Sequence, residues 1–270
     1  MPSVAVVLLG LPCHLRLSAG PRILALMTER TTSWQALRGQ FIVLDGPDGA
    51  GKSTQLALLA EVLRGAGLEV VTVRDPGGTA IGDRIRAILL DKTHMEMAVA
   101  CELMLYMASR AQLVAQEIRP ALKRGACVLC DRYISSTIAY QGAGGADVAA
   151  IRSVGNVAVG GLWPALTIIL DLPADVGLTR VGKRGTPGTF EQAPADSAEA
   201  NTPAGEANAN MDRMELKGLE FHRRVRDGFL AQAAAQADRF AVVDATSEPS
   251  QVHKAIVENV ARLAGSQQDP

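Results

Sequence analysis

The chain has 270 residues, of which 48% are hydrophobic, so it is long enough to bury a sizeable core in one domain. A formal net charge of −1 leaves no broad basic field, which argues against a polynucleotide partner and favours small anionic ligands. The apolar stretch at 4–11 is too short to cross a bilayer and follows no Lys or Arg, so we expect neither a membrane span nor an export signal.

The start of the chain is expected to lie outside the fold. Residues 1–38 form an N-terminal extension that is either disordered or the product of a misassigned start. Met27 is followed by the polar stretch 28–33, and translation from Met27 would make residues 1–26 a gene-calling artefact. The globular domain is then expected over 39–264, with a short tail at 265–270.

The cysteines suggest a reducing environment. They show no disulfide framework, and Cys127 and Cys130 lie in one apolar run that is typical of a strand. Residues three apart on a strand face opposite sides, so these thiols are poorly placed to chelate a metal ion and are expected to be buried and reduced. This pattern favours the cytoplasm.

Residues 40–56 contain the most informative motif. An apolar run with β-branched residues leads into G-P-D-G-A-G-K-S at 46–53, a full match to G-x-x-x-x-G-K-[ST], and a helical pattern follows. In this context successive backbone N–H groups hold phosphate oxygens, while Lys52 contacts the β- and γ-phosphates and Ser53 binds Mg²⁺. A chance glycine turn capped by Ser53 is the alternative. The motif predicts ATP binding by Gly46, Pro47, Asp48, Gly49, Ala50, Gly51, Lys52, Ser53 and Thr54.

Strand and helix patterns alternate along the rest of the chain. After the strand that enters the phosphate loop, strands are predicted at 69–73, 126–130, 166–172 and 240–243. Helices are predicted at 55–64, 81–90, 97–118, 147–159, 174–184, 211–234 and 249–263. A turn is expected at 120–125, and a helical turn with a glycine-rich break at 135–142. The alternation predicts an α/β fold, a five-stranded parallel sheet with helices on both faces.

Residues 186–210 differ in composition from the rest of the chain. This segment is rich in Ala, Pro, Gly, Asn and Thr, has one aromatic residue and no Lys or Arg, and carries four acids. Such a segment cannot bury enough apolar surface to order itself. We expect an insert that loops out into solvent, because its acids would repel ATP.

Residues suited to an acceptor ligand occur on one predicted helix and after one predicted strand. Glu102, Tyr106 and Arg110 are spaced i, i+4 and i+8, so they share a helix face. This arrangement allows a flat base to stack on Tyr106 while an oxygen of the base accepts a hydrogen bond from Arg110. An Arg that snorkels beside a core Tyr is the alternative. Arg132 follows a buried strand, which favours an anionic ligand as its partner, and a structural ion pair with Asp131 is the alternative.

Six segments carry motifs that occur together in one family. They read G-P-D-G-A-G-K-S-T at 46–54, R-D-P-G-G-T at 74–79, L-Y-M-A-S-R at 105–110, D-R-Y-x-x-S-T-x-A-Y-Q-G at 131–142, D-R-M-E at 212–215 and V-D-A-T at 243–246. The chain thereby resembles the bacterial thymidylate kinases, which are P-loop nucleoside monophosphate kinases. The resemblance covers about 39–263 apart from the insert. It implies transfer of the γ-phosphoryl group of Mg²⁺-bound ATP to dTMP, giving dTDP and ADP for dTTP synthesis, under a mobile lid at about 180–215.

The resemblance also implies which residues bind the thymine base. Tyr106 would stack on thymine, and Arg110 would bind its carbonyl edge. Thr137 and Gln141 would contact the base, and Pro76 would line the nucleoside pocket.

On the sugar and phosphate side, the resemblance implies that Arg132 holds the dTMP phosphate and that Tyr140 favours deoxyribose by crowding the 2′ position. Asp48 would lie near the sugar 3′-OH and the metal ion. The dTMP phosphate has a second pKa of about 6 and is largely ionised at neutral pH, so no general base is needed. Catalysis is therefore assigned to cations, namely Lys52, Arg132 and a cation from the lid.

The lid cation is expected near the end of the helix at 174–184. The phosphate loop has no arginine, which implies the type of family member that supplies one from the lid. Arg180, Lys183 and Arg184 would share a helix face, with Arg184 as the catalytic candidate and Arg180 packing on adenine, although a solvated basic helix end is the alternative. Gly182 stands where the family has a basic residue. The closing segment of the lid would include Asp212 and Glu215.

Other functions remain open at this point. A kinase for another nucleoside monophosphate or for a deoxynucleoside shares these motifs, and one methyl group supplies only about 1 to 3 kcal/mol of discrimination. A regulatory P-loop ATPase would hydrolyse ATP without an acceptor, whereas a GTPase switch needs an N-K-x-D signature that this sequence lacks. An inactive scaffold is disfavoured because Lys52, Ser53, Arg110 and Arg132 are present.

The expected partners are ATP, dTMP and a second copy of the chain. The resemblance implies a homodimer built from helices. The apolar face of the segment 97–114 offers surface for this contact, but a position in the core explains the same residues.

Overall fold

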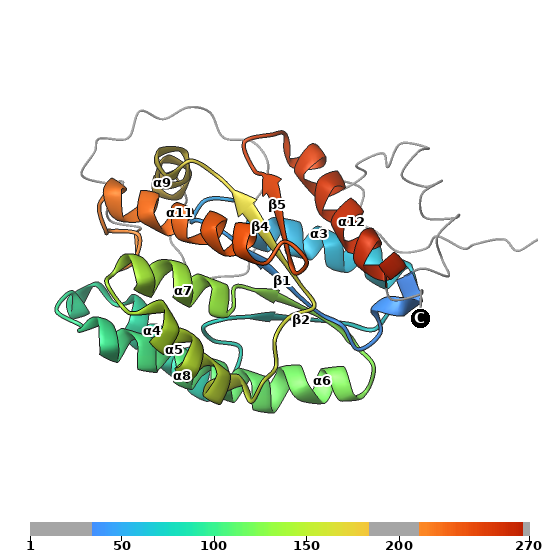
Figure 1. The fold of residues 1–270 in the computed structure, drawn as a ribbon, viewed down its shortest axis with the longest axis horizontal. Helices are drawn as coiled ribbons and strands as arrows, with labels where there is room; N and C mark the ends of the chain where they lie inside the picture. The colour runs from blue at the N-terminus through green and yellow to red at the C-terminus, as the bar shows by residue number, and fades with distance from the viewer. Residues whose placement is uncertain (1–33, 184–210, 267–270) are drawn as a thin grey trace, which may run out of the picture.

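The computed structural model describes residues 34–183 and 211–266 (Figure 1). The predictions about Met27, the insert at 186–210 and Arg184 lie outside the described residues. No helix within the described ranges is long and apolar enough to cross a membrane.

The core of the fold is a sheet of five strands, β1 (Phe41–Asp45), β2 (Val70–Arg74), β3 (Cys127–Asp131), β4 (Leu166–Asp171) and β5 (Phe240–Asp244). Their order is β2-β3-β1-β4-β5, and each neighbouring pair is parallel. All five residues of the central strand β1 are buried, as expected for a strand covered on both faces. The predicted α/β fold with a five-stranded parallel sheet is confirmed.

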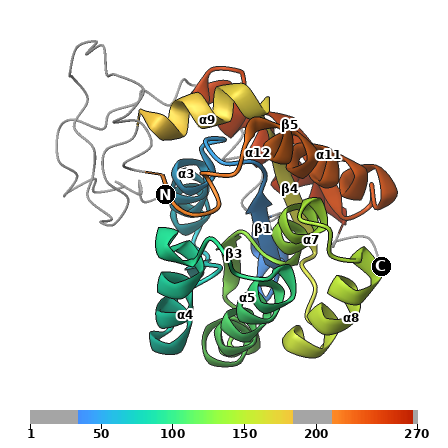
Figure 2. The same ribbon diagram turned by 90° about the vertical axis from the view of Figure 1, so that its left-hand side faces the viewer.

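Helices cover both faces of the sheet (Figures 1 and 2). One face, with Ile42 and Leu44, packs against α3 (Lys52–Gly65), α12 (Pro249–Ser266) and the short η1 (Gln35–Leu37). The other face, with Phe41 and Val43, packs against α5 (Val99–Leu113), α7 (Ile134–Ala143) and α8 (Val148–Val159). Further helices are α4 (Ala80–Leu90) beside α5, α11 (Leu219–Ala235) beside α7, α9 (Ala174–Gly182) after β4, and the short η2 (Lys92–His94).

The two cysteines of β3 lie on opposite faces of the sheet. Cys127 belongs to the core cluster that contains α3 and α12, and Cys130 to the cluster that contains α5 and α8. Both thiols are buried and free. No group of His, Cys, Asp or Glu side chains in the described ranges forms a ready metal-binding cluster. The two thiols of β3 are thus buried on opposite faces of the sheet, as predicted.

The helix predicted at 97–118 and the turn predicted at 120–125 differ from the structure. Helix α5 continues through a π-helical segment, η3 (Val114–Ile118), into α6 (Arg119–Lys123). Pro120 lies in the first turn of α6, where a residue without an N–H is tolerated. The turn begins only after Lys123, and Gly125 adopts a φ of 85° there. The proline was therefore a misleading stop signal.

Two other predicted elements have different bounds. The helical turn predicted at 135–142 is the full helix α7, and the helix predicted from 211 begins only at Leu219. Residues 212–217 form turns because Asp212 and Glu215 bond to each other's backbone N–H groups, each at 2.9 Å.

The N-terminal boundary predicted at 39 is too late. Trp34 and Leu37 are buried, with 4% and 0% of their surface exposed, in the core cluster under α3 and α12. The folded domain therefore includes at least the last five residues of the predicted extension at 1–38.

Candidate active site

The phosphate loop connects the carboxyl end of β1 to the first residue of α3. A Cβ at Gly46 would collide with the backbone of Leu170, and one at Gly49 would collide with that of Gly177, so both positions require glycine. The loop thus lies tightly against β4 and α9. Lys52 Nζ donates to the carbonyl oxygens of Gly46 at 3.1 Å and Pro47 at 2.7 Å.

The charge of Lys52 is sensitive to its surroundings. The side chain is buried, and burial together with the nearby Arg132 cation lowers the pKa of Lys52 from 10.5 to about 8. The carboxylates of Asp48, Asp131 and Asp45 act in the opposite direction. Lys52 is therefore a cation at neutral pH, and negative phosphate groups would stabilise that form further.

Asp45 anchors the base of the loop. Its carboxylate is fully buried and accepts hydrogen bonds from Gly46 N at 2.9 Å, Ser135 Oγ at 2.6 Å and Ser136 Oγ at 2.7 Å. It also lies 3.5 Å from Arg132 Nη1. Sequence reasoning missed Asp45, although its position directly before the glycine turn was a usable signal.

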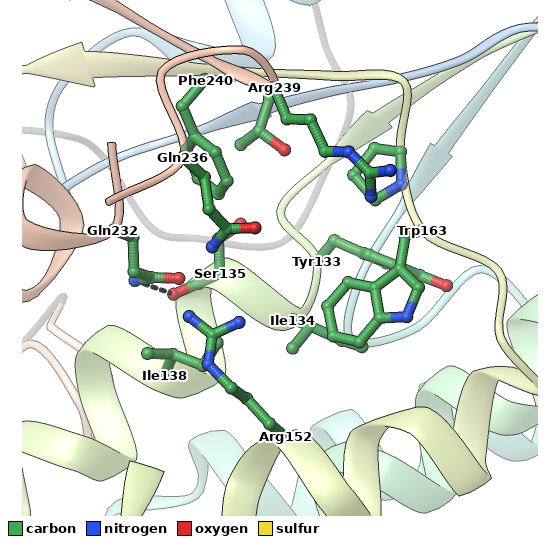
Figure 3. A pocket seen from close by; sticks show the side chains of 12 residues that line it. Tyr133, Ile134, Ser135, Ile138, Arg152, Trp163, Gln232, Gln236, Arg239 and Phe240 are labelled. Atoms are coloured by element: carbon green, nitrogen blue, oxygen red, sulfur yellow. Dashed lines mark hydrogen bonds between the residues drawn. The ribbon is translucent and has the colours of Figure 1, made fainter. Parts of the chain in front are cut away.

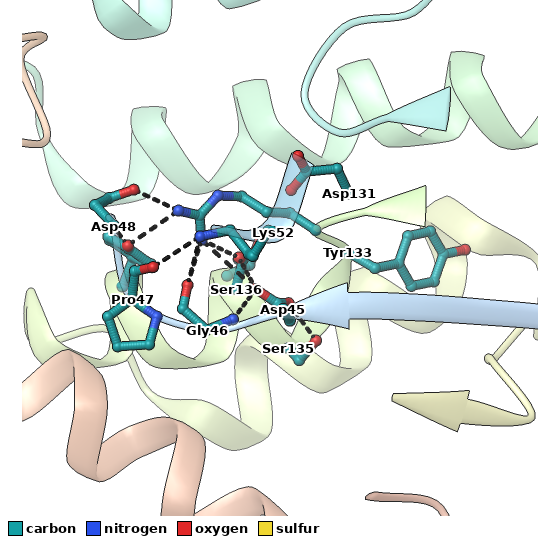
Figure 4. A network of polar contacts seen from close by, with 12 residues as sticks. Asp45, Gly46, Pro47, Asp48, Lys52, Asp131, Tyr133, Ser135 and Ser136 are labelled. Atoms are coloured by element: carbon teal, nitrogen blue, oxygen red, sulfur yellow. Dashed lines mark hydrogen bonds and ion pairs between the residues drawn. The ribbon is translucent and has the colours of Figure 1, made fainter. Parts of the chain in front are cut away.

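Arg132 joins the phosphate loop to helix α7. Its Nη1 donates to the carbonyl oxygen of Gly46 and to Ser136 Oγ, both at 3.0 Å, and its Nη2 forms an ion pair with Asp48. The guanidinium carbon lies 5.2 Å from the centre of the Tyr140 ring. Figure 4 shows Asp45, Asp48 and Lys52 close to Gly46 and Pro47, whose carbonyl oxygens accept hydrogen bonds from Lys52. The predicted acceptor-side cation is thus adjacent to the predicted ATP loop.

Asp48 points toward Arg132 and Tyr140. Its carboxylate accepts a 2.5 Å hydrogen bond from the Tyr140 hydroxyl in addition to the Arg132 contact. Burial raises the pKa of Asp48, but the charges of Arg132 and Lys52 and the Tyr140 hydrogen bond outweigh it and lower that pKa to about 2. Asp48 is therefore a carboxylate throughout the physiological pH range.

Ser53 contacts the carboxylate of Asp131 rather than that of Asp48. Its Oγ donates a 2.5 Å hydrogen bond to Asp131 at the end of β3. An ion pair between Asp131 and Arg132 was the alternative considered from the sequence. In the structure Arg132 pairs with Asp48 and Asp45 instead. Asp131 was not among the predicted site residues, and only its place beside Arg132 in the D-R-Y motif indicated it.

Arg110 is buried, with 1% of its surface exposed, so the alternative of a snorkelling arginine is wrong. Its Nε pairs with Asp75, and its Nη2 donates to the Tyr133 carbonyl at 3.2 Å and to Thr137 Oγ1 at 3.0 Å. Nη1 contacts only the sulfur of Met107, at 3.2 Å, among the described residues. Nη1 is therefore the part of Arg110 with spare donor capacity.

The remaining residues predicted at the base pocket lie on α5, α7 and the loop after β2. Gln141 is buried and donates through Nε2 to Glu102 at 2.7 Å. Tyr106, one turn along α5 from Glu102, is half-buried. The carbonyl oxygen of Pro76 accepts a 3.0 Å hydrogen bond from Arg86. The predicted trio of Glu102, Tyr106 and Arg110 thus shares a helix, but two of its members are engaged within the chain.

Arg180 lies beside the phosphate loop on its other side. Its Nη1 is 3.5 Å from the carbonyl oxygen of Gly49 and 3.3 Å from that of Ala245. Ala245 belongs to the V-D-A-T segment that the sequence assigned to the adenine side. Lys183 is exposed at the end of α9.

Comparison with known proteins identifies the family. The family model for thymidylate kinase matches residues 44–200. The thymidylate kinase of Deinococcus radiodurans is 47% identical over 210 residues, which cover 77% of this chain and 90% of that protein. The chain belongs to the thymidylate kinase family. It is therefore a kinase, that is, a phosphotransferase, and the resemblance stated from its motifs is confirmed.

Other thymidylate kinases agree with this assignment. One from Pseudomonas fluorescens is 44% identical over 221 residues, which cover 82% of this chain and 94% of that protein. The crystal structure of thymidylate kinase from Ehrlichia chaffeensis matches with a TM-score of 0.60 and 28% identity, covering 82% of this chain and 97% of that one. The fold of this family member is therefore that of a solved thymidylate kinase.

This member of the thymidylate kinase family also has a cavity of about 150 Å³ away from the phosphate loop (Figure 3). Thr167 and Phe240, near the amino ends of β4 and β5, contribute to its wall, as do Arg152 and Arg239. The phosphate loop follows the carboxyl end of β1 instead. None of the predicted site residues lines this cavity, but Ser135, whose hydroxyl donates to Asp45 at the base of the phosphate loop, does.

Proposed function

We infer that the chain transfers the γ-phosphoryl group of ATP to dTMP, giving dTDP and ADP for dTTP synthesis. Family membership supports the reaction, and the position of Arg132 carries the assignment of the acceptor side. Arg132 contacts the carbonyl oxygen of Gly46, so a cation for the dTMP phosphate lies next to the loop that holds ATP. A phosphate dianion bound there would be close to the γ-phosphate of ATP.

The catalytic role of the protein is to bring two polyanions together. The attacking phosphate oxygen is already ionised at neutral pH, because a phosphate monoester has a second pKa of about 6. Lys52 stabilises charge on the ATP side and Arg132 on the acceptor side. Asp48 holds Arg132 in place through an ion pair. Tyr140 holds it through its hydroxyl oxygen and through the contact between its ring and the guanidinium. This support favours the predicted roles of Asp48 and Tyr140 near the sugar.

The base binds between α5, α7 and the loop after β2. Tyr106 stacks on thymine, Nη1 of Arg110 donates to a carbonyl oxygen, and Pro76 lines the pocket. Gln141 contacts the base through Oε1, since Nε2 is bound to Glu102. Thr137 acts mainly by holding Arg110, because its Oγ1 accepts from that guanidinium.

The residues around Ser53 suit a magnesium ion. The Ser53 hydroxyl and the Asp131 carboxylate, which are in contact, are hard oxygen donors, and Mg²⁺ in phosphoryl-transfer sites typically uses one or two carboxylates plus phosphate oxygens. Ser53 and Asp131 would hold the ion, which would neutralise charge on the phosphates of ATP. Asp48 was also predicted here, but its contacts with Arg132 and Tyr140 support the acceptor side more directly.

Cations near the end of α9 cover the ATP side. Arg180 packs on adenine, which its contacts with Gly49 and Ala245 support. Lys183 and Arg184 supply positive charge near the phosphates, with Arg184 as the catalytic candidate. Asp212 and Glu215 close the lid segment through the turn that they form with each other.

The working form is a homodimer in the cytoplasm. Exposed apolar side chains lie on three helices that run beside one another in Figure 2, namely Ile88 on α4, Met104 on α5 and Val157 on α8. Such surface is costly to leave in water and suits a second copy of the chain. The buried reduced thiols of β3 fit a reducing compartment. Light scattering of the wild type and of Met104→Lys tests the dimer, and a monomeric wild type would contradict it.

Acceptor-dependent release of ADP tests the function. With ATP present, addition of dTMP should start ADP release and produce dTDP in equal amounts, whereas a regulatory ATPase would release ADP without an acceptor. Sustained hydrolysis that dTMP does not change would contradict the proposed reaction.

A further inference from the structure

A buried carboxylate contacts the amide that is expected to bind the base. Glu102 on α5 has 2% of its surface exposed, and its Oε1 accepts the 2.7 Å hydrogen bond from Gln141 Nε2. Gln141, on α7, is itself 1% exposed. A buried charge is costly unless it is paired, so Glu102 needs partners at this position.

Two cations from the segment before α11 supply those partners. Arg213 Nη2 lies 2.5 Å from Glu102 Oε2, and Arg213 is buried to the same degree as Glu102. Lys217 Nζ lies 3.8 Å from the same oxygen. Arg213 is held in turn by the carbonyl oxygen of Leu89, at 2.8 Å from its Nε. Between two cations Glu102 is a carboxylate, and a carboxylate only accepts hydrogen bonds.

This carboxylate decides which way the Gln141 amide faces. An amide has a donor end and an acceptor end, and only the donor end can face a carboxylate. Nε2 must therefore face Glu102, and the direction of Oε1 is fixed with it. Oε1 has no partner among the described residues. Without Glu102, either end of the amide could point toward a ligand.

Arg110 presents a donor in the same region. Thr137 lies one helical turn before Gln141 on α7 and accepts from Arg110 Nη2, so both side chains come from one face of that helix. Nη1 of Arg110 has only a thioether contact among the described residues. The region between α5 and α7 thus combines an unused acceptor, Gln141 Oε1, with an unused donor, Arg110 Nη1.

We propose that Glu102 is a specificity-determining positioning residue for the acceptor base. The proposal rests on the proposed function, in which Gln141 contacts the base. Thymine and uracil carry a proton on N3 that Oε1 can accept, whereas N3 of cytosine is itself an acceptor and would face Oε1 without a proton. Glu102 therefore favours dTMP over dCMP, although it does not touch the nucleotide.

The substitution Glu102→Gln tests this role. The new amide has the same size but can offer either a donor or an acceptor, so Gln141 becomes free to turn. We expect the ratio of kcat/KM for dTMP to that for dCMP to fall at least about 10-fold, with the change mainly in KM and little change in kcat for dTMP. The matched control Glu96→Gln, at an exposed position, should leave the ratio unchanged. An unchanged ratio in Glu102→Gln, or an equal loss for both nucleotides, would overturn the proposal.

Two further variants keep the test decisive. Glu102→Gln leaves Arg213 without its carboxylate partner, which could unfold the protein. In that case the double variant Glu102→Gln/Arg213→Gln, which removes both buried charges, replaces the single variant in the same comparison of dTMP with dCMP. In a Gln141→Met background, Glu102→Gln should no longer change the dTMP to dCMP ratio, and a further change there would contradict the proposal. A wild type that does not phosphorylate dTMP would refute the proposed function. An active wild type with an unaffected ratio in the variants would refute only the role of Glu102.

Discussion

The cations on the two sides of the site are held in different ways. On the proposed acceptor side, Arg132 pairs with Asp48, and Arg110 pairs with Asp75. On the proposed ATP side, the hydrogen bonds of Lys52 and Arg180 within the described ranges are with backbone carbonyl oxygens. A carboxylate partner fixes a cation before a ligand arrives but cancels part of its charge, whereas a carbonyl partner carries no formal charge and cancels less of it. The difference suits a small acceptor that must be oriented and a triphosphate that must be neutralised.

Removal of Arg132 is expected to have the largest effect. Arg132→Ala should lower turnover by about 10³- to 10⁵-fold, because the acceptor phosphate loses its cation and Asp48 and Asp45 lose their partner. ATP binding, measured by titration without dTMP, should change little because Lys52 remains. Arg152→Ala is a matched control, since Arg152 lines the cavity near the amino ends of β4 and β5 and is not a predicted site residue, and it should retain activity. Turnover within about tenfold of wild type in Arg132→Ala would show that another group holds the phosphate.

Removal of Lys52 should affect the opposite side. Lys52→Ala should lower kcat/KM for ATP by about 10²- to 10³-fold, because one preorganised cation is lost from the phosphate loop. Binding of dTMP alone should be nearly unchanged in a titration. If dTMP binding falls as far as ATP binding does, the division between the two sides is wrong.

The same lysine predicts a smaller effect of pH. Its pKa in the ligand-free protein is lowered from 10.5 to about 8, so the cation is present below that value and is lost as the pH rises through it. Because kcat/KM reports the free enzyme, kcat/KM for ATP should fall roughly 10-fold between about pH 7 and about pH 9. Lys52→Arg should flatten this part of the profile. A fall that persists unchanged in Lys52→Arg would assign it to another group.

Deletion of residues 186–210 should have the smallest effect. The insert is acidic and low in apolar residues, so we expect turnover within a fewfold of wild type when it is removed. Steady-state kinetics of the deletion variant checks this expectation. A collapse of activity would show that the insert takes part in the reaction and that the ATP side includes more than the described residues.

The sequence was most informative where a function depends on neighbouring residues. The phosphate loop, the strands and the opposite faces of Cys127 and Cys130 all follow from local spacing. The sequence was less informative where partners come from distant segments. Asp45 with Ser135, and Ser53 with Asp131, meet only because parallel strands end at one edge of the sheet.

The residues predicted to bind the base show the same limit. The spacing of Glu102, Tyr106 and Arg110 correctly placed them on one helix, but it gave no sign that Arg213 pairs with Glu102. The two residues are 111 positions apart, which no periodicity can connect. The turn predicted from Pro120 was wrong for a different reason. Proline disrupts the interior of a helix but is tolerated in its first turn, which is where Pro120 lies in α6.

An acceptor panel tests the account most directly. Wild-type protein with ATP would be offered dTMP, dUMP, dCMP and thymidine in turn, and the diphosphate or monophosphate product would be measured together with ADP. We predict the highest kcat/KM for dTMP, a lower value for dUMP and a much lower value for dCMP. We predict no product from thymidine, which lacks the phosphate that Arg132 is proposed to hold. Efficient phosphorylation of thymidine, or a preference for dCMP, would contradict the assignment of Arg132 and Gln141 to the acceptor side.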